Sequence, residues 1–195
     1  MSSFLAHSLV GIIIGNQKER KSLKEIVFIS FFFMVLALSP DIDYLINYLR
    51  DEHMSIRYTH SVTFAFCVGL GALVFRKFFF KKSLKNLPWY LFFMASFSHL
   101  VLDFFVGVHG NPYLYPFTSS LIVSPLGILP SSGRMDIHNY YFWRNMLLEI
   151  AIFLPLILVF IPKIRAYVFR YKLLVLLIGL VFIVGIFVGL GLDRS

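Results

Sequence analysis

The stretch SFSHLVLDFF, residues 96–105, carries a histidine and an aspartate four positions apart in an otherwise apolar segment. Residues i and i+4 of an α-helix share one face, so the pattern predicts a helix on which His99 and Asp103 reach the same point. An aspartate at the centre of a membrane helix costs about 2.5–3.5 kcal/mol on insertion scales, which makes it a candidate for function. The alternative is a His–Asp hydrogen bond that only holds helices together.

The rest of the chain is equally apolar. Of its 195 residues, 58% are hydrophobic and 14% are charged, and the mean hydropathy is +0.80, whereas soluble domains are about 45–50% apolar and about 25% charged. Apolar runs cover residues 3–15, 25–39, 61–80, 87–108, 145–162 and 172–192. We therefore expect an all-α integral membrane protein, a helical bundle of about five to six membrane-embedded helices.

The length suits one membrane-embedded domain over residues 1–195. We expect a core at 1–117, an outer loop at 118–144 and two C-terminal transmembrane helices within 145–195. Cys67 is the only cysteine, which excludes an intramolecular disulfide. GIIIG at 11–15 and GIFVG at 185–189 match the spacing of small residues in helix pairs, but membrane helices often contain this spacing by chance.

The distribution of charge predicts the topology. The net charge is +8, and 13 of the 18 Lys and Arg residues lie in three connections, 16–24, 76–85 and 163–172. Under the positive-inside rule these connections are cytoplasmic, which places both termini and the connections 40–60 and 109–144 outside. The expected location is the plasma (inner) membrane of a prokaryote, with several spans. Short membrane-flanking basic loops are a poor fit for nucleic acid, so the lipid bilayer is the expected partner.

This topology brings the polar residues of the apolar segments to the outer face of the membrane. The residues are His7, Asp41, Asp43, His60, His99 and Asp103. In SPDID, Pro40 ends a helix and two carboxylates follow in an irregular loop, where they suit a cation or, alternatively, cap the next helix. In RYTHS, His60 opens an apolar segment, either as a ligand or as a bystander to a helix cap. A lone histidine such as His7 is alternatively a hydrogen-bonded core residue.

Three histidines and three aspartates form a donor set for a metal site. Mixed imidazole and carboxylate ligands suit zinc first, with manganese or iron as alternatives. Zinc takes about four ligands per ion, so the set predicts two or three divalent ions with water or shared carboxylates completing the coordination. Glu149, at the outer start of a later helix, is a candidate partner of a ligating histidine or a salt-bridging residue.

The ordered motifs THS at 59–61, SHLVLD at 98–103 and GNPYLYPF at 110–117 resemble the YdjM-like family of predicted membrane-bound metal-dependent hydrolases. The resemblance extends from His7 to Phe117, and it implies a remote similarity to zinc-dependent phospholipase C with the same six residues as metal ligands. The family usually has a His-Arg pair, as in HRGxTHS, where this chain has Ser55 and Ile56. His53 and Arg57 are displaced from those places.

The expected activity is therefore metal-dependent hydrolysis of a phosphate ester, such as a phospholipid, at the outer membrane–water interface. A bound metal ion activates water in such enzymes. We expect Asp43 to orient that water or accept its proton, and Arg57 to bind the phosphate. GNPYLYPF is either a lip over the site or part of an interfacial aromatic belt. Two other functions remain open, a non-enzymatic protein with a structural metal and a small transporter that relays ions or protons.

Overall fold

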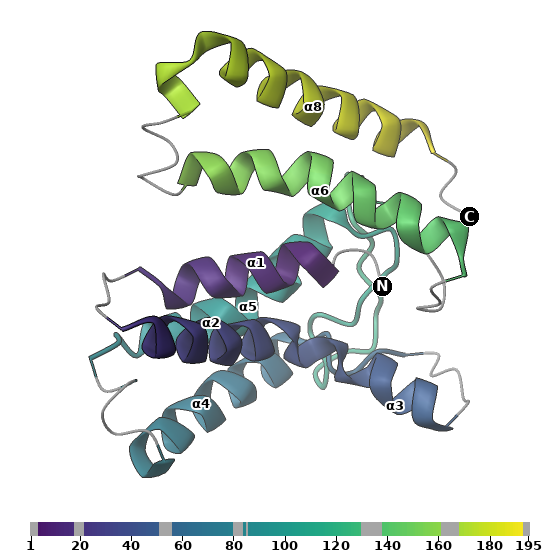
Figure 1. Ribbon diagram of the computed structural model, residues 1–195. Coiled ribbons are helices and arrows are strands. Elements are labelled where there is room, and N and C mark those ends of the chain that lie inside the picture. The colour runs from purple at the N-terminus through teal and green to yellow at the C-terminus, as the bar shows by residue number, and fades with distance from the viewer. Residues whose placement is uncertain are drawn as a thin grey trace. The chain divides into compact units, whose positions relative to one another are not determined.

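The structure is a computed structural model that describes residues 4–17, 22–50, 56–79, 84, 86–129, 138–160 and 168–192. The regular secondary structure of these residues consists of α-helices and one 3-10 turn, with a single isolated bridge between Asn111 and Ile122 in place of any strand. The elements, in chain order, are α1 (Phe4–Gly15), α2 (Leu23–Leu38), η1 (Ser39–Asp41), α3 (Ile42–Arg50), α4 (Val62–Phe79), α5 (Tyr90–Val106), α6 (Tyr140–Phe160) and α8 (Lys172–Gly191) (Figure 1).

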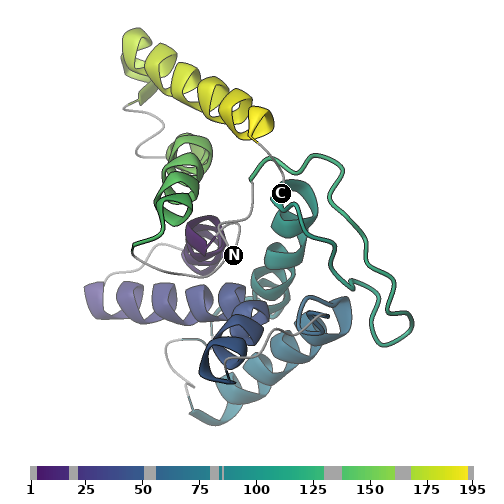
Figure 2. The ribbon, with the colours of Figure 1, turned by 90° about the vertical axis from the view of Figure 1, so that its right-hand side faces the viewer.

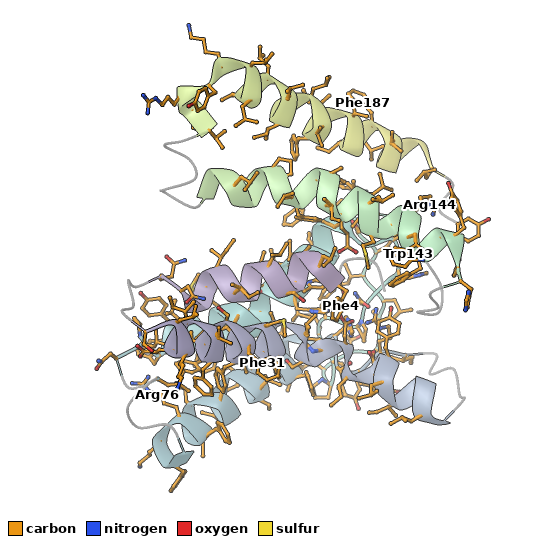
Figure 3. All side chains as sticks on the ribbon, viewed as in Figure 1. Phe4, Phe31, Arg76, Trp143, Arg144 and Phe187 are labelled. Carbon is orange, nitrogen blue, oxygen red and sulfur yellow. The ribbon has the colours of Figure 1, made fainter. Side chains whose placement is uncertain are left out.

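Each of the six apolar runs overlaps one long helix, so the all-α prediction is confirmed, although α6 begins at Tyr140, before its run at 145–162. Among the described residues, two segments are long and apolar enough to cross a membrane, Leu23–Ile46 and Lys172–Gly191. Large apolar side chains on both point outward, such as Phe31 at 60% and Phe187 at 72% exposure (Figure 3). The prediction of about five to six membrane-embedded helices stays a prediction. Most of the Lys and Arg residues of the three basic connections lie outside the described residues.

The prediction of an irregular loop at SPDID is wrong. Pro40 follows the end of α2, but the chain continues as the 3-10 turn η1 and then directly as α3. Proline lacks an N–H and fits the first turn of a helix, where that N–H has no helical partner. The turn therefore redirects the chain without unwinding it, with Asp41 in the turn and Asp43 in the first turn of α3.

The chain divides into two compact units. Unit 1 comprises Met1–Ala6, Phe105–Val108 and Ser124–Ser195, and unit 2 comprises His7–Phe104 and His109–Val123. In unit 1, α6 and α8 lie side by side (Figure 2). In unit 2, buried side chains of α1, α2, α4 and α5 form the core, with Phe33 and Phe92 fully buried at its centre. The predicted single domain, with its boundaries at 117 and 144, stays a prediction.

Close packing of α1 on α2 depends on two glycines of GIIIG. A Cβ at Gly11 would lie 2.5 Å from the carbonyl oxygen of Phe33 and 2.8 Å from the Cβ of Ala37, and one at Gly15 would lie 2.8 Å from the Phe33 ring. A carbonyl oxygen of the backbone cannot move away as a flexible side chain can. The two glycines of GIIIG therefore do act in helix packing, which the sequence alone could not distinguish from a chance spacing. Their contact with α2 brings His7, one turn before Gly11, toward α2.

We expect Gly11→Ala to destabilise the protein and Gly71→Ala to leave it unchanged or slightly more stable. Alanine is favoured over glycine in a helix by about 1 kcal/mol, and a Cβ at Gly71 meets nothing within 4 Å. At Gly11 the steric overlap opposes that gain, and overpacking costs about 1–3 kcal/mol. Thermal unfolding of the two variants in detergent, followed by circular dichroism, measures this difference. Equal midpoints in both variants would contradict the close α1–α2 contact.

Candidate metal centre

The six predicted donor residues come together inside unit 2. His7 lies on α1, Asp41 in η1, Asp43 on α3, His60 directly before α4, and His99 and Asp103 on α5. We call this set the His/Asp cluster. Its members form three overlapping triads whose donor atoms lie within 4.8 Å of one another; the triads are His7–Asp41–His99, His60–His99–Asp103 and Asp41–Asp43–His60. The cluster can therefore bind a metal ion.

Four donor atoms of the cluster converge most closely. His60 Nε2 lies 3.2 Å from His99 Nε2, 3.4 Å from Asp103 Oδ2 and 3.5 Å from Asp41 Oδ1. His99 Nε2 lies 3.6 Å from each of the same two carboxylate oxygens. Metal bonds of about 2.0–2.2 Å in a tetrahedral site place neighbouring donor atoms about 3.3–3.6 Å apart. The two histidine nitrogens, taken with either carboxylate oxygen, therefore have the spacing of neighbouring ligands of one ion.

The Nδ1 atoms of His60 and His99, on the opposite side of each ring from the converging Nε2 atom, have hydrogen-bond acceptors. His99 Nδ1 lies 2.7 Å from the carbonyl oxygen of Ala37, and His60 Nδ1 lies 3.4 Å from Asp43 Oδ2. We assign a proton to each of these Nδ1 atoms, because a carbonyl and a carboxylate can only accept. In neutral rings the two Nε2 atoms then hold lone pairs that face each other. This arrangement, with the second nitrogen bound to a carbonyl or carboxylate, is typical of histidines that ligate metals.

His7 completes one side of the cluster. Its Nε2 lies 3.2 Å from Asp103 Oδ1, and its ring stacks on that of His99 with centroids 3.7 Å apart. His7, His60 and His99 are each at most 1% exposed, and Asp103 is 5% exposed. Burial of carboxylates is costly unless cations or hydrogen-bond donors compensate them, so an uncompensated cluster of this kind would be unstable.

Arg57 supplies one positive charge to the cluster. Its Nε donates to Asp43 Oδ2 at 2.9 Å, its Nη2 donates to Asp41 Oδ1 at 3.1 Å, and Nη2 also contacts His60 Nε2. The guanidinium lies over the ring of Tyr44, 4.3 Å from its centroid. The predicted phosphate-binding residue is therefore at the cluster, directly beside the converging donor atoms. His53, the other residue displaced from the family's His-Arg pair, lies outside the described residues.

Asp43 occupies a different position from the other carboxylates. Its Oδ1 accepts the backbone N–H of Tyr44 at 2.8 Å, and its Oδ2 is shared by Arg57 Nε and His60 Nδ1. It is 1% exposed. Asp43 therefore faces Nδ1 of His60, on the opposite side of the ring from the converging Nε2 atom. It also belongs to one of the three triads. Its predicted roles as ligand and as proton acceptor stay predictions.

Glu149, the candidate partner of a ligating histidine, lies in unit 1. Its Oε2 accepts the backbone N–H of Leu5 at 2.8 Å and that of Ala6 at 3.4 Å. These N–H groups belong to the first turn of α1, where helices leave donors unsatisfied and favour negative charge. Glu149 thus caps the start of α1, and its role toward a histidine stays a prediction.

The segment GNPYLYPF contributes Asn111, which sequence reasoning did not select. Asn111 Nδ2 donates to Asp103 Oδ2 at 3.3 Å, and the backbone of Asn111 pairs with Ile122 in both directions. The carbonyl oxygen of Tyr113 accepts the N–H of Val62 at the start of α4. Burial raises the pKa of Tyr113 to about 12, so its hydroxyl stays protonated near neutral pH. The start of this segment therefore packs against the cluster, whereas Phe117 at its end is 90% exposed.

We expect Asn111→Ala to weaken metal binding by about 10–100-fold, the usual cost of losing a hydrogen bond to a metal ligand. The amide orients Asp103 Oδ2, one of the four converging donor atoms. Titration of the metal-depleted protein with zinc in competition with a chelator measures the change. Asn139→Ala, on a residue that caps the start of α6 in unit 1, is the matched control. Unchanged zinc affinity in Asn111→Ala would show that the amide does not act on the site.

The sequence profile of the YdjM inner membrane protein family matches residues 1–190. No curated protein and no solved structure is significantly similar to the chain. The match covers nearly the whole sequence, including every residue of the His/Asp cluster. The similarity to zinc-dependent phospholipase C stays a prediction.

Proposed function

The chain belongs to the YdjM family of inner membrane proteins, and on that premise we propose that its His/Asp cluster holds a divalent metal ion for the hydrolysis of a phosphate ester at the membrane interface. One observation carries the proposal. The Nε2 atoms of His60 and His99 face each other at 3.2 Å with an oxygen of Asp41 and one of Asp103 beside them. Arg57 Nη2 already contacts His60 Nε2 and Asp41 Oδ1, and the remaining lone pair of His99 Nε2 and the carboxylate oxygen of Asp103 support a further cation beside it.

Zinc is the ion that we propose, with manganese and iron as alternatives. Two imidazoles and two carboxylates are ligands that zinc accepts in tetrahedral sites. Three carboxylates and the guanidinium of Arg57 leave a net charge of minus two when the histidines are neutral, and one divalent ion balances that charge. Charge balance thus favours one tightly held ion. The overlapping triads that contain His7 and Asp43 offer donors for the two or three ions predicted from the sequence.

The chain's own residues would bind and orient the substrate. A bound divalent ion polarises a phosphoryl oxygen and lowers the pKa of a bound water. Arg57 presents Nε and Nη2 on one edge of its guanidinium, the geometry for two parallel hydrogen bonds to phosphate oxygens. When Arg57 turns from Asp43 to a phosphate, Asp43 Oδ2 is released to accept a proton from the attacking water. His60 Nδ1 remains as the second donor to that oxygen.

The proposal is tested on the full-length protein purified in detergent. Bound metals are counted by mass spectrometry, and hydrolysis of a chromogenic phosphodiester and of phospholipids is followed in the same preparation. We expect about one zinc ion per chain and metal-dependent turnover that chelation removes and zinc restores. Absence of bound zinc, manganese and iron would refute the metal centre. Bound metal without turnover of any of these esters would favour the structural role instead.

We also propose that the site faces the extracytoplasmic side of the membrane, as the positive-inside rule implies. In a Cys67→Ala background, a cysteine introduced at exposed His109 is expected to react with an impermeant maleimide added to intact cells. A cysteine at exposed Lys24 is expected to react only after the membrane is opened. The background substitution is needed because Cys67 is itself exposed. The reverse labelling pattern would place the site on the cytoplasmic side.

A further inference from the structure

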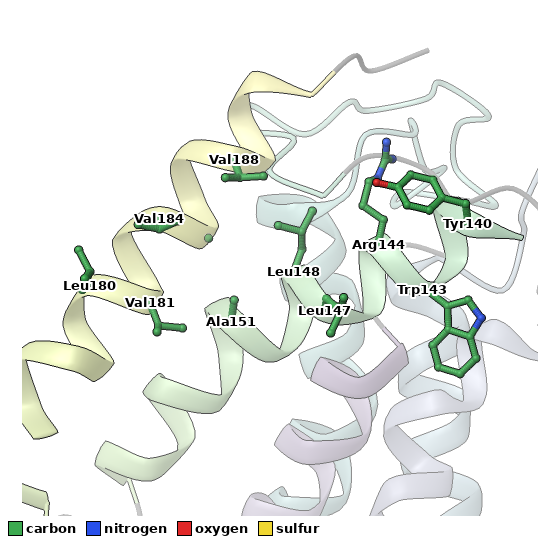
Figure 4. Close-up of a pocket in the computed structure, with 11 residues that line it drawn as sticks. Tyr140, Trp143, Arg144, Leu147, Leu148, Ala151, Leu180, Val181, Val184 and Val188 are labelled. Atoms are coloured by element: carbon green, nitrogen blue, oxygen red, sulfur yellow. The ribbon is translucent and has the colours of Figure 1, made fainter.

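Unit 1 contains an apolar groove between α6 and α8. Its volume is about 490 Å³, within the range of about 300–1,000 Å³ found for small-molecule sites. Leu147 and Leu148 of α6 and Val181 and Val184 of α8 contribute to its walls (Figure 4). The residues of the His/Asp cluster lie in unit 2. The groove therefore needs an explanation that does not depend on the metal centre.

Two small residues bring the helices together along the groove. A Cβ added at Gly185 would lie 3.1 Å from the Cβ of Ala151 and 3.1 Å from Cγ1 of Ile152. Gly185 and Ala151 line the groove themselves, so its floor is formed almost without side chains. Gly185 is the first glycine of GIFVG, and its lack of a side chain leaves space that a larger residue would fill. The surface that faces the space is almost purely apolar.

The groove has one polar end. Tyr140, Trp143 and Arg144 lie together near the start of α6, and all three belong to the lining (Figure 4). Arg144 Nε and Nη2 both donate to Asn145 Oδ1 at 3.3 Å, and the guanidinium lies over the Tyr141 ring at 4.9 Å from its centroid. The side chain is thus held in place beside the groove. Tyrosine and tryptophan are enriched at the membrane interface, so the guanidinium of Arg144 beside Tyr140 and Trp143 is placed to bind a phosphate there.

We propose that this groove is a specific site for an anionic glycerophospholipid. One acyl chain lies between α6 and α8, and the phosphate binds Arg144. The occupant must combine a long apolar part with a negative charge at one end, because the groove is apolar along its length and cationic at its end. An 18-residue window within α8 has a mean hydropathy of 3.2, and the chain belongs to a family of inner membrane proteins, so lipid is the surrounding medium. A guanidinium has five N–H donors and a fixed positive charge, so Arg144 can bind a phosphate as well as Asn145.

The two tryptophans of the chain provide a matched pair of reporters. Trp143 lines the groove, whereas Trp89 lies in unit 2 and is 64% exposed. Trp89→Phe and Trp143→Phe variants, each with one tryptophan, are reconstituted in phosphatidylcholine vesicles. Two series of vesicles contain increasing fractions of brominated lipid, one of brominated phosphatidylglycerol and the other of brominated phosphatidylcholine. Quenching of the tryptophan fluorescence is measured in each series.

For Trp143 we expect half-maximal quenching at an about fivefold lower fraction of brominated phosphatidylglycerol than of brominated phosphatidylcholine. The Trp89 reporter should show no such preference. Arg144→Gln should abolish the preference at Trp143, and Lys77→Gln, at an exposed lysine of unit 2, should retain it. Val181→Phe, which fills the groove, should also abolish it, whereas Leu176→Phe on the exposed surface of α8 should not.

Three outcomes would overturn the proposal. One is an equal preference at both tryptophans, which would indicate attraction to the protein's overall positive charge. Another is a preference that survives Arg144→Gln and Val181→Phe. The third is a dimeric protein that Val181→Phe converts to a monomer without any lipid preference in either form, which would assign the groove to a second copy of the chain.

Discussion

Replacement of His60 by alanine is expected to remove the bound metal and with it any hydrolytic activity. His60 Nε2 lies 3.2–3.5 Å from three other donor atoms, which places it at the centre of the converging set. Loss of a residue that hydrogen-bonds to a metal ligand costs about 10–100-fold in metal affinity. Loss of the ligand His60 itself should cost more. Metal content per chain after dialysis, together with phosphodiester hydrolysis, measures the effect.

The control and a second variant separate metal loss from misfolding. His138→Ala removes an exposed histidine and should leave metal content at the wild-type value. His60 is fully buried, so its alanine variant also leaves a cavity. Asp41→Asn keeps the volume of its side chain and removes one converging carboxylate, and it should lose metal as well. Wild-type metal content in both His60→Ala and Asp41→Asn, with the helical circular dichroism signal retained, would refute the proposed donor set.

Arg57→Gln is expected to move metal affinity and activity in opposite directions. The guanidinium contacts Asp41, Asp43 and His60, so it competes electrostatically with a metal ion for the same acceptors. Unit charges about 4 Å apart interact by about 4 kcal/mol at an effective dielectric constant of 20, so a gain of about tenfold in metal affinity is a conservative expectation. Loss of the phosphate contact should lower kcat/KM by about 10²–10³-fold, as when one transition-state donor is removed.

Arg57→Lys tests the two effects separately. Lysine keeps the positive charge but lacks the planar edge with two parallel donors. We expect metal affinity near the wild-type value and activity between that of wild type and Arg57→Gln. Zinc titration and hydrolysis kinetics on the three proteins give both quantities. If Arg57→Gln instead loses metal, the guanidinium is a structural support of the cluster; if it keeps full activity, another residue binds the phosphate.

The donor residues were predictable because their chemistry conflicts with their surroundings. His99 and Asp103 stand out in SFSHLVLDFF for the cost of burying them among apolar residues, and their spacing of four by itself indicates a shared helix face. The six long helices were predictable for a related reason, since each overlaps a long apolar run. The six donors were expected to converge on one membrane face, and they meet in one buried cluster.

Other parts of the site depend on contacts between segments that are distant in the sequence. Asn111 reaches Asp103 only because the loop after α5 folds back and pairs with Ile122. The carbonyl of Ala37 orients His99 although the two residues are 62 positions apart. An asparagine in a loop and a backbone carbonyl have no distinctive signal in a sequence, because they are common and their role arises from position alone. The place of Asn111 within GNPYLYPF is the only hint of its role that the sequence contains.

Sequence by itself determined the all-α class, the helical segments and the residues able to bind a metal, because hydrophobic runs and buried ionisable groups are properties of local composition. Tertiary structure alone decided which donor atoms converge, that Asp43 faces Nδ1 of His60, and that Arg57, expected to bind the phosphate, contacts the donors themselves. It also decided that Gly11 and Gly185 bring helices into contact. These features depend on distances of a few ångströms between separate helices, and no local pattern of residues specifies such distances.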